Sequence, residues 1–495
     1  MDKVIEIEIT NTECKVVSKL DPYVANVLRE KCSFAPVGSE YIANYYRKKR
    51  VEWDGIRRLY NIQTRRFPVG LLALVTKSLG EMGLSIEYIN KRNLADTAGT
   101  VDYVMANFQE REYQTRAVRA SVAAGNGIIK AATGSGKTTI AARTIGAIKS
   151  PAVFIVHTRD LLYQTIEAFD NMFPNEKIGQ VGDGTVDFQN ITVATVQSLA
   201  ILGGVKYESQ HDDDYTPIIE RKDNQNYKRQ ENIDKFNEYR NNVGVVMFDE
   251  VQLISSQSAF NVRFLFDRAN YAFGYSASPW RDDGSDLMLE AAFGARICDI
   301  TASELIELGY LVQPTITIKQ VQNRIWKGSK YDEIYKSAIV DNAMRNVQVI
   351  SDAWNEFSQG RNTLVLVTRI AHGEILESAF KDMNIPAVFI SGKSRMKDRR
   401  RVIHEMREGK KQLVIASTIA DVGLDVPRLE SIIEAGAGKS SVTALQRLGR
   451  IMRPFPGKTS CHFITYRDTA KYIREHIDRK IDIWRTEPKF IIEER

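Results

Sequence analysis

The residues with the clearest chemistry lie in the segment 131–138, which reads A-A-T-G-S-G-K-T. The segment 127–130 before it, G-I-I-K, is typical of a short buried strand, and the apolar spacing of 139–148 after it predicts a helix. Glycines in such a turn let backbone N–H groups close around phosphate oxygens, and the positive end of the helix strengthens that field. The segment predicts a phosphate-binding loop, with a chance glycine-rich turn as the alternative. The residues expected to contact a nucleotide are Thr133, Gly134, Ser135, Gly136, Lys137 and Thr138.

Two adjacent acidic residues are candidates for the chemistry of a nucleotide bound at this loop. Asp249 and Glu250 follow the apolar run 243–248, which predicts a second buried strand that ends at them. We expect Asp249 to hold Mg²⁺ together with the hydroxyl of Thr138, while Lys137 neutralises the β- and γ-phosphates. Glu250 would orient the attacking water or take its proton. The pattern predicts hydrolysis of a nucleoside triphosphate.

Three side chains outside the loop are candidates for the remaining nucleotide contacts. Gln114 precedes the loop, and its amide offers both a donor and an acceptor to adenine. Arg450 and Arg453 lie three residues apart, a spacing that predicts one helical face, in a region with no phosphate loop of its own. Such arginines suggest fingers that reach a triphosphate bound elsewhere. Structural ion pairs are the alternative.

Polar residues also follow several predicted strands, such as 153–156 and 191–195. Residues at the carboxyl ends of parallel strands face the crevice of an open α/β sheet, where they can hold a sugar-phosphate backbone. Local helix caps are the alternative for each of them. The residues predicted to contact nucleic acid in this region are Thr158, Arg159, Gly182, Thr195 and Gln197.

Five segments in order resemble those of a superfamily 2 helicase: AATGSGKT, DEVQ, SASP, ASTIADVGLDVP and QRLGRIMR. The resemblance implies two RecA-like domains, Mg-ATP hydrolysis, and DNA bound across both domains. It adds Gly423 and Asp425 on the sugar side of the nucleotide, and Gln446 beside the two arginines. Lys393 and Thr418, which follow the predicted strands 387–390 and 413–416, are further candidate DNA contacts. The segment SASPWRDDG is similar to the branch of excision-repair and phage recombination helicases.

The chain departs from the family pattern at three places. Gln252 replaces the usual His or Asp of the acidic box, but an amide can still hydrogen-bond across the site. Ser278 replaces the usual Thr and keeps the hydroxyl. The charged stretch 203–242 is extra, and we interpret it as an insertion, partly helical over 227–239, that projects toward DNA or the N-terminal domain; a passive solvated loop is the alternative.

The N-terminal region interleaves basic pairs with aromatic residues between positions 45 and 67. Basic side chains neutralise phosphates and aromatic rings stack on bases, so the pattern favours nucleic-acid binding. A solvated face above an aromatic core is the alternative. The segment EWDGIRRLYNIQTRRFPVGLL resembles that of the UvsW-type phage helicases, which remodel branched DNA. The candidate DNA contacts here are Arg57, Arg58, Arg65 and Arg66.

These features predict an α/β protein with two tandem RecA-like parallel-sheet domains and a small N-terminal α/β domain. The predicted limits are 1–100 for a duplex-DNA-binding domain, 101–313 for the first motor domain with its insertion 203–242, and 314–495 for the second.

The composition of the 495 residues is that of a soluble globular protein with a net charge of +6, which permits a polyanionic partner. No apolar run approaches the ~18–20 residues of a membrane span, and no signal peptide is recognisable, so we expect a cytoplasmic protein, in the host cytoplasm if it is phage-encoded. The scattered cysteines argue against zinc. We expect a monomer with ATP and Mg²⁺ as cofactors and DNA as partner.

The sequence predicts ATP-driven unwinding or branch migration of forked and junction DNA in recombination, repair or fork remodelling. The alternatives are a duplex-DNA translocase of a restriction-type system, an RNA helicase, and a DNA-binding scaffold with a degenerate motor. We recognise no nuclease-like cluster of acidic residues and lysine at either end, which argues against the restriction-type translocase. The presence of Lys137, Glu250 and Arg453 opposes the last.

Overall fold

The protein is described by a computed structural model that covers residues 4–36, 39, 53–93, 99–205, 227–255, 257–277, 286–321, 326–410, 412–417, 426–436 and 441–495. It divides into two compact units. The first consists of Met1–Ala131 and Gly136–Asp299, and the second of Ala132–Ser135 and Ile300–Arg495.

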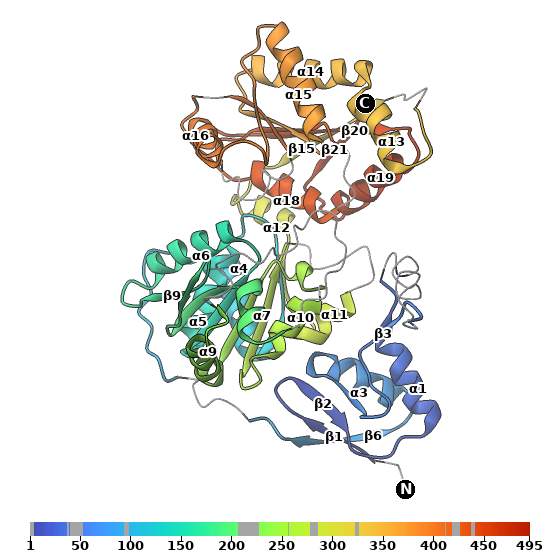
Figure 1. The fold of residues 1–495 in the computed structure, drawn as a ribbon, viewed down its shortest axis with the longest axis vertical. Helices are drawn as coiled ribbons and strands as arrows, with labels where there is room; N and C mark the ends of the chain where they lie inside the picture. The colour runs from blue at the N-terminus through green and yellow to red at the C-terminus, as the bar shows by residue number, and fades with distance from the viewer. Residues whose placement is uncertain are drawn as a thin grey trace. The chain divides into compact units, whose positions relative to one another are not determined.

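The N-terminal part of the first unit is a small α/β fold (Figure 1). Its four-stranded sheet has the order β5-β2-β1-β6. The alternation of isoleucine and glutamate in β1 buries Ile5 and Ile7, which join one apolar cluster with Leu28 and Leu79 of the two helices. The elements are β1 (Val4–Ile9), β2 (Glu13–Val16), α1 (Pro22–Lys31), β5 (Arg66–Pro68), η1 (Val69–Leu71), α3 (Leu72–Glu81) and β6 (Ser85–Asn90). A separate short ladder joins β3 (Ser33–Phe34) to β4 (Arg57–Arg58).

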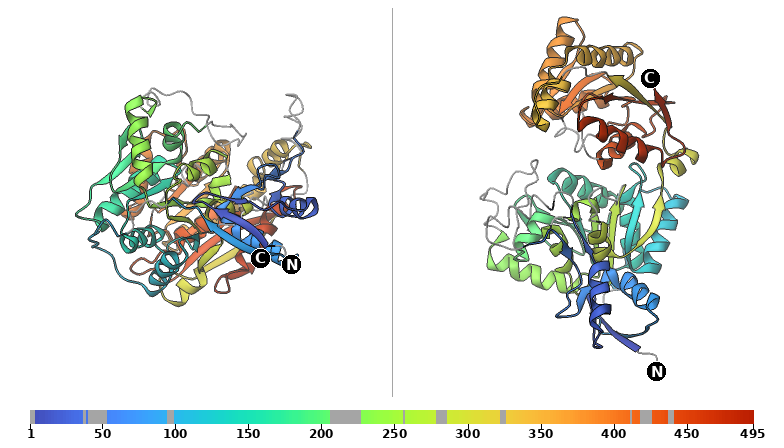
Figure 2. Two further views of the ribbon diagram at one scale, coloured as in Figure 1. Left: turned by 90° about the horizontal axis from the view of Figure 1, so that it is seen from below. Right: turned by 90° about the vertical axis from the view of Figure 1, so that its right-hand side faces the viewer.

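The rest of the first unit is built on an eight-stranded sheet with the order β10-β9-β11-β8-β12-β13-β7-β14. The strands from β9 to β7 in this order pair in parallel, whereas β10 is antiparallel to β9. Helices cover both faces, as Figures 1 and 2 show. The strands are β7 (Asn126–Ala131), β8 (Ala152–Val156), β9 (Ile178–Gly182), β10 (Thr185–Asp187), β11 (Ile191–Thr195), β12 (Val245–Asp249), β13 (Tyr271–Ser276) and β14 (Arg296–Ile300). The helices are α4 (Glu112–Ala124), α5 (Lys137–Ile148), α6 (Arg159–Met172), α7 (Val196–Leu202), α9 (Gln230–Asn242), η2 (Val251–Ser255), α10 (Gln257–Phe264) and α11 (Asp286–Phe293).

The second unit carries a seven-stranded parallel sheet with the order β17-β18-β16-β19-β20-β15-β21. Its strands are β15 (Pro314–Val321), β16 (Thr363–Val367), β17 (Val388–Ile390), β18 (Leu413–Ser417), β19 (Ser431–Glu434), β20 (Cys461–Asp468) and β21 (Ile491–Glu494). Its helices include α12 (Ala302–Glu307), α14 (Ala343–Ser358), α15 (Ile370–Asp382), α16 (Met396–Arg407), α18 (Ser441–Ile451) and α19 (Ile473–Trp484). Two largely parallel sheets covered by helices confirm the predicted α/β class with tandem RecA-like domains.

Helix α15 begins five residues before the helix that periodicity predicts at 375–383. Its first turn holds His372 and Gly373, which interrupt the apolar pattern although both are buried. A Cβ on Gly373 would lie 2.3 Å from the ring of Phe389, so close packing on β17 requires glycine there. The first turn of α15 is therefore set by packing against β17, and the spacing of apolar residues in the sequence does not predict it.

The part of the insertion 203–242 that the structure describes, 203–205 and 227–242, is packed. Helix α9 buries Phe236, whose ring contacts Phe266 edge-on with centroids 6.0 Å apart. The hydroxyl of Tyr239 donates to the carbonyl of Ala152 at 3.0 Å. A solvated loop is therefore wrong for this part, and residues 206–226 lie outside the described residues.

Among the described residues, the helices are all too short or too polar to cross a membrane. The four cysteines, Cys14, Cys32, Cys298 and Cys461, are buried free thiols. Burial raises the pKa of Cys14, Cys32 and Cys461 to about 12, so these thiols stay protonated and behave as small apolar side chains.

Candidate nucleotide site and nucleic-acid contacts

The predicted phosphate loop connects β7 to α5, as the sequence pattern indicates. Gly134 and Gly136 have φ of +89° and +79°, a left-handed backbone that favours glycine. Gly136 has a second reason to lack a side chain, because a Cβ there would lie 2.7 Å from Nε2 of Gln114. The structure thus brings the predicted adenine-reading glutamine against the loop.

The candidate catalytic residues of the first unit meet at the end of β12. This strand is fully buried and delivers Asp249, and Glu250 follows with a φ of +47°. A left-handed backbone is unusual for glutamate and marks a position where strain is kept. Nζ of Lys137 lies 3.4 Å from Oε1 of Glu250.

The two acids differ in their preference for a proton. Burial, together with the charge of Glu250, raises the pKa of Asp249 to about 7. Burial also raises that of Glu250, but the charge of Lys137 and a hydrogen bond from Gln252 outweigh it and hold its pKa below the usual value. A buried carboxyl with a carboxylate beside it and an elevated pKa fits a cation site, since a divalent ion would stabilise its charged form. Asp249 with the hydroxyl of Thr138, in the first turn of α5, is an oxygen donor set suited to Mg²⁺.

Gln252 links the acidic pair to the end of the neighbouring strand. Its Nε2 donates to Oε2 of Glu250 at 2.7 Å, and its Oε1 accepts from Oγ of Ser276 at 2.5 Å. The side chain is buried. The amide therefore replaces the family's His or Asp with a bridge of its own, while Ser278 and the rest of that segment lie outside the described residues.

Sequence reasoning missed His157 as part of this site. It directly follows β8 and is buried, and its pKa is lowered to about 4 by burial, although the charge of Glu250 acts in the opposite sense. The imidazole is therefore neutral near pH 7. The only signal in the sequence was its place after a buried strand.

The predicted DNA contacts of the first unit gather at one edge of the sheet. They lie at or just after the carboxyl ends of β8, β9 and β11, and β11 pairs with both other strands. Thr158 and Thr195 cap α6 and α7, accepting backbone N–H groups at 3.3 Å, so the local-cap alternative applies to both. Arg159 pairs with Asp183 at 2.5 Å.

Gly182 and Gln197 also have local partners. A Cβ on Gly182 would lie 2.7 Å from Cδ2 of Leu162, so its glycine serves helix packing. Nε2 of Gln197 donates to the carbonyl of His157 at 3.3 Å. The five residues form a polar edge, and their contact with DNA remains a prediction.

Two of the four predicted N-terminal arginines serve the fold. The guanidinium of Arg65 donates from Nη1 to the carbonyls of Val17 and Ser18, at 2.7 and 3.0 Å. Nη1 of Arg57 lies 3.3 Å from Sδ of Met288 in α11. Both contacts join segments distant in sequence.

The other two arginines pair with carboxylates near the surface. Arg58 pairs with Asp54. Nη1 of Arg66 lies 2.7 Å from Oε2 of Glu13, and the side chains of Arg66 and Glu13 are each about half exposed. Exposed ion pairs are weakened by competition with solvent and salt, so a phosphate can compete for such arginines. The basic pairs at 47–50 lie outside the described residues.

In the second unit, α18 carries Gln446 and Arg450 and ends at Ile451, so Arg453 lies beyond the helix. The prediction that the two arginines share one helical face is therefore wrong. Pro454 explains the difference, because the residue before a proline disfavours helical backbone. Thr418, Gly423 and Asp425 lie outside the described residues, and Lys393 is exposed after β17.

A buried charge cluster that sequence reasoning missed fixes α18. Oε1 of Glu434, at the end of β19, lies 2.6 Å from Nη1 of Arg447 and 2.8 Å from Nζ of Lys480 in α19. Oγ1 of Thr465 donates to its other oxygen at 2.9 Å. Burial raises the pKa of Glu434, but the two cations outweigh it and keep the carboxylate charged.

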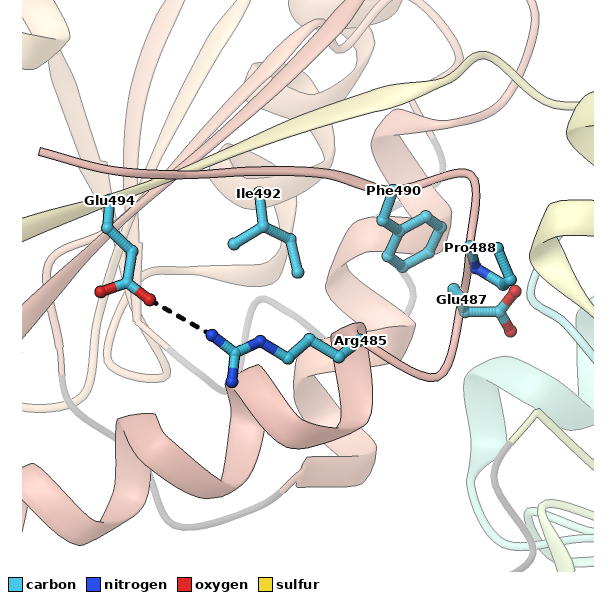
Figure 3. Close-up of a pocket in the computed structure, with 6 residues that line it drawn as sticks. All are labelled: Arg485, Glu487, Pro488, Phe490, Ile492 and Glu494. Atoms are coloured by element: carbon cyan, nitrogen blue, oxygen red, sulfur yellow. Dashed lines mark ion pairs between the residues drawn. The ribbon is translucent and has the colours of Figure 1, made fainter.

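The second unit also has a hollow of about 340 Å³ beside β21, which none of the predicted site residues lines (Figure 3). Arg485 reaches toward Glu494 across it, with Nη2 and Oε1 3.5 Å apart. Glu487 caps α12 instead, accepting from the N–H and the hydroxyl of Ser303 at 2.8 and 2.7 Å. The charged residues that line the hollow, Arg485, Glu487 and Glu494, thus have partners within the chain.

Comparison with known proteins agrees with this architecture. Residues 107–281 match the family described as "Type III restriction enzyme, res subunit", and residues 344–454 match "Helicase conserved C-terminal domain". "Putative helicase 22" of a Sulfolobus islandicus filamentous virus is 26% identical, over 90% of this chain and 83% of that protein. "ATP-dependent DNA helicase uvsW" of Enterobacteria phage T4 is 22% identical, over 82% of this chain and 80% of that protein. The solved structure "ATP-dependent Type ISP restriction-modification enzyme LlaBIII bound to DNA" shares the fold, with a TM-score of 0.57 and 13% identity over 85% of this chain and 34% of that chain.

The fold and the site define a motor with two RecA-like domains and a phosphate loop. The chain belongs to the superfamily 2 helicases and is an ATP-dependent DNA helicase similar to the UvsW type.

Proposed function

We propose that this helicase unwinds or branch-migrates forked and junction DNA, as in recombination, repair or fork remodelling. The observation that carries the proposal is the N-terminal α/β fold, which contains the UvsW-like segment and presents Arg58 and Arg66 in displaceable surface pairs. Phosphate contacts position a duplex without reading its sequence, so binding would select structure rather than sequence.

We assign the chemistry to the residues at the end of β12 and in the loop. Lys137 binds the β- and γ-phosphates, and Thr138 and Asp249 hold Mg²⁺, which would neutralise phosphate charge when bound. Glu250 orients the attacking water, and Gln252 holds the Glu250 carboxylate in place. Arg450 and Arg453 stabilise charge that develops in the transition state.

A basic surface in the second unit supports the DNA-binding part of the proposal. The segment 393–410 is rich in lysine and arginine, and Lys393 alone among these residues was predicted to contact DNA. Its exposed basic residues are Lys393, Arg395, Lys397, Arg400, Arg401, Arg407 and Lys410. They begin after the carboxyl end of β17, where ligands of open α/β sheets bind.

The second candidate function is translocation on duplex DNA without strand separation. The match of residues 107–281 to a restriction-enzyme subunit family and the shared fold with a restriction-modification enzyme favour it.

One set of measurements on the full chain separates the candidates. ATP turnover and strand separation are measured with duplex, single-stranded, forked and four-way-junction DNA and with RNA. We expect junctions and forks to be separated and to stimulate turnover most. Turnover stimulated by plain duplex with no strand separation on any substrate would instead establish the translocase.

A further inference from the structure

The N-terminal fold contacts α11 through backbone atoms, at Gly70 of η1. A Cβ on Gly70 in η1 would lie 1.9 Å from the carbonyl oxygen of Glu290, 2.7 Å from that of Ala291 and 2.8 Å from the nitrogen of Gly294. Side chains do not approach backbone this closely, so only glycine fits. Gly70 lies outside the left-handed region, and the requirement is therefore one of space alone.

The residues around Gly70 pack against α11, and we call this contact the Gly70 seat. Val69 and Leu71 are buried and share one apolar cluster with Leu289 and Ala292 of α11. The contact of Arg57 with the sulfur of Met288 adds a polar edge to it.

Helix α11 also packs on the segments that hold the catalytic residues. The ring of Phe293 meets that of Phe248 edge-on, with centroids 5.6 Å apart. A Cβ on Gly274 would lie 2.5 Å from Cγ1 of Val251 and 3.1 Å from Cδ2 of Phe293. Phe248 directly precedes Asp249, Val251 directly precedes Gln252, and Gly274 lies two residues before Ser276.

We propose that α11 is a positioning element, through which the seating of the N-terminal fold on Gly70 sets the geometry of the Glu250–Gln252–Ser276 hydrogen bonds and hence the rate of ATP hydrolysis. Tightly packed elements transmit small displacements, and a hydrogen bond near 2.6 Å weakens steeply when its angle changes. Nucleotide binding would be spared, because Gln114 and Lys137 belong to α4 and α5 and not to α11. The inference depends on ATP hydrolysis by the chain and not on the choice of DNA substrate.

The test compares Gly70→Ala with Gly80→Ala in the full chain. Gly80 lies in α3, has an ordinary backbone and nothing within 4 Å of an added Cβ, so it is a matched control. We expect Gly70→Ala to lower kcat by about 10- to 100-fold, the scale of a displacement of about 1 Å in an active site, with the KM for ATP unchanged. Backbone amide exchange should rise in α11 and η2 but not in α5. Gly80→Ala should behave as the wild type.

A second variant approaches α11 from the catalytic side. Phe293→Leu removes the ring contact with Phe248 and leaves the N-terminal seat intact, so it decides the question even if Gly70→Ala does not fold. It should also lower kcat without raising KM, and the double variant should be less impaired than the product of the two single effects. An unchanged kcat in Phe293→Leu, or equal losses in Gly70→Ala and Gly80→Ala, would overturn the proposal. A wild-type chain without ATP turnover would instead refute the enzymatic assignment.

Discussion

Glu250 is a residue whose position reveals more than its type. Its left-handed backbone and its contacts with Lys137 and Gln252 place a charged carboxylate inside a buried site. Strain of about 1–3 kcal/mol at such a position persists only where the surroundings enforce it. The arrangement is typical of a group that must face a reacting water.

Removing the charge of Glu250 while keeping its shape should separate binding from hydrolysis. Glu250→Gln is expected to bind Mg-ATP and to lower kcat by about 10²-fold or more, the usual contribution of a general base. Lys137→Ala should weaken nucleotide binding and turnover together, because it removes the phosphate charge partner. Nucleotide titration and steady-state turnover measure both, and turnover near the wild-type rate in Glu250→Gln would refute the catalytic assignment.

The three arginines of the QRLGRIMR segment should fall into two classes. Arg450→Ala and Arg453→Ala are expected to lower kcat by about 10³-fold with small changes in ATP affinity, as for arginine fingers. Arg447→Ala should instead lower the free energy of unfolding, by up to about 3–5 kcal/mol, because it removes one of the two cations from buried Glu434. Denaturant unfolding and kinetics together give the comparison, and an Arg453→Ala variant with altered affinity but normal kcat would exclude the finger role.

At the scale of elements, the sequence predicted most strands and helices because buried parallel strands form continuous apolar runs. The buried run 152–156 of β8 and that of β12 illustrate this. What escaped prediction depends on contacts between distant segments. The start of α15, the Glu434 cluster and the seat at Gly70 all arise where residues far apart in the chain meet, and no local spacing encodes them.

The described part of the insertion allows a test of its two roles. Phe236→Ala in α9 should lower the free energy of unfolding by about 3–5 kcal/mol, since it removes a fully buried ring. Deleting 208–224 and joining the ends with a short glycine-serine linker should keep that stability, and we predict that it impairs junction unwinding. Thermal unfolding and unwinding assays measure the two effects, and a deletion variant with normal unwinding would make the segment a passive loop.

At the scale of the whole molecule, the N-terminal fold carries a mixed sheet surface rather than a uniformly basic one. Side chains alternate along β1, so Glu6 and Glu8 face away from the core that holds Ile5 and Ile7. Lys15 pairs in register with Glu8. For the four candidate arginines within the described residues, those engaged in the fold must therefore be separated from those in surface ion pairs.

The last prediction uses that separation to test DNA loading. Arg57 and Arg65 support the fold, so their reversal would confuse binding with unfolding, whereas Arg58 and Arg66 sit in surface pairs. Arg58→Glu combined with Arg66→Glu should leave the basal, DNA-independent ATPase intact, because the nucleotide residues belong to other elements.

Fork and junction unwinding by this double variant should fall sharply, with a smaller effect on turnover stimulated by short single strands. If each arginine neutralises one phosphate, the slope of log binding constant against log salt should become shallower by about 2, since each contact contributes about 0.9. Lys77→Glu with Lys91→Glu makes the same charge change at exposed positions of the same fold and serves as the control. Junction unwinding that persists in the arginine variant at moderate salt would mean that the N-terminal fold does not load DNA, and its remaining role would be the one it plays through α11.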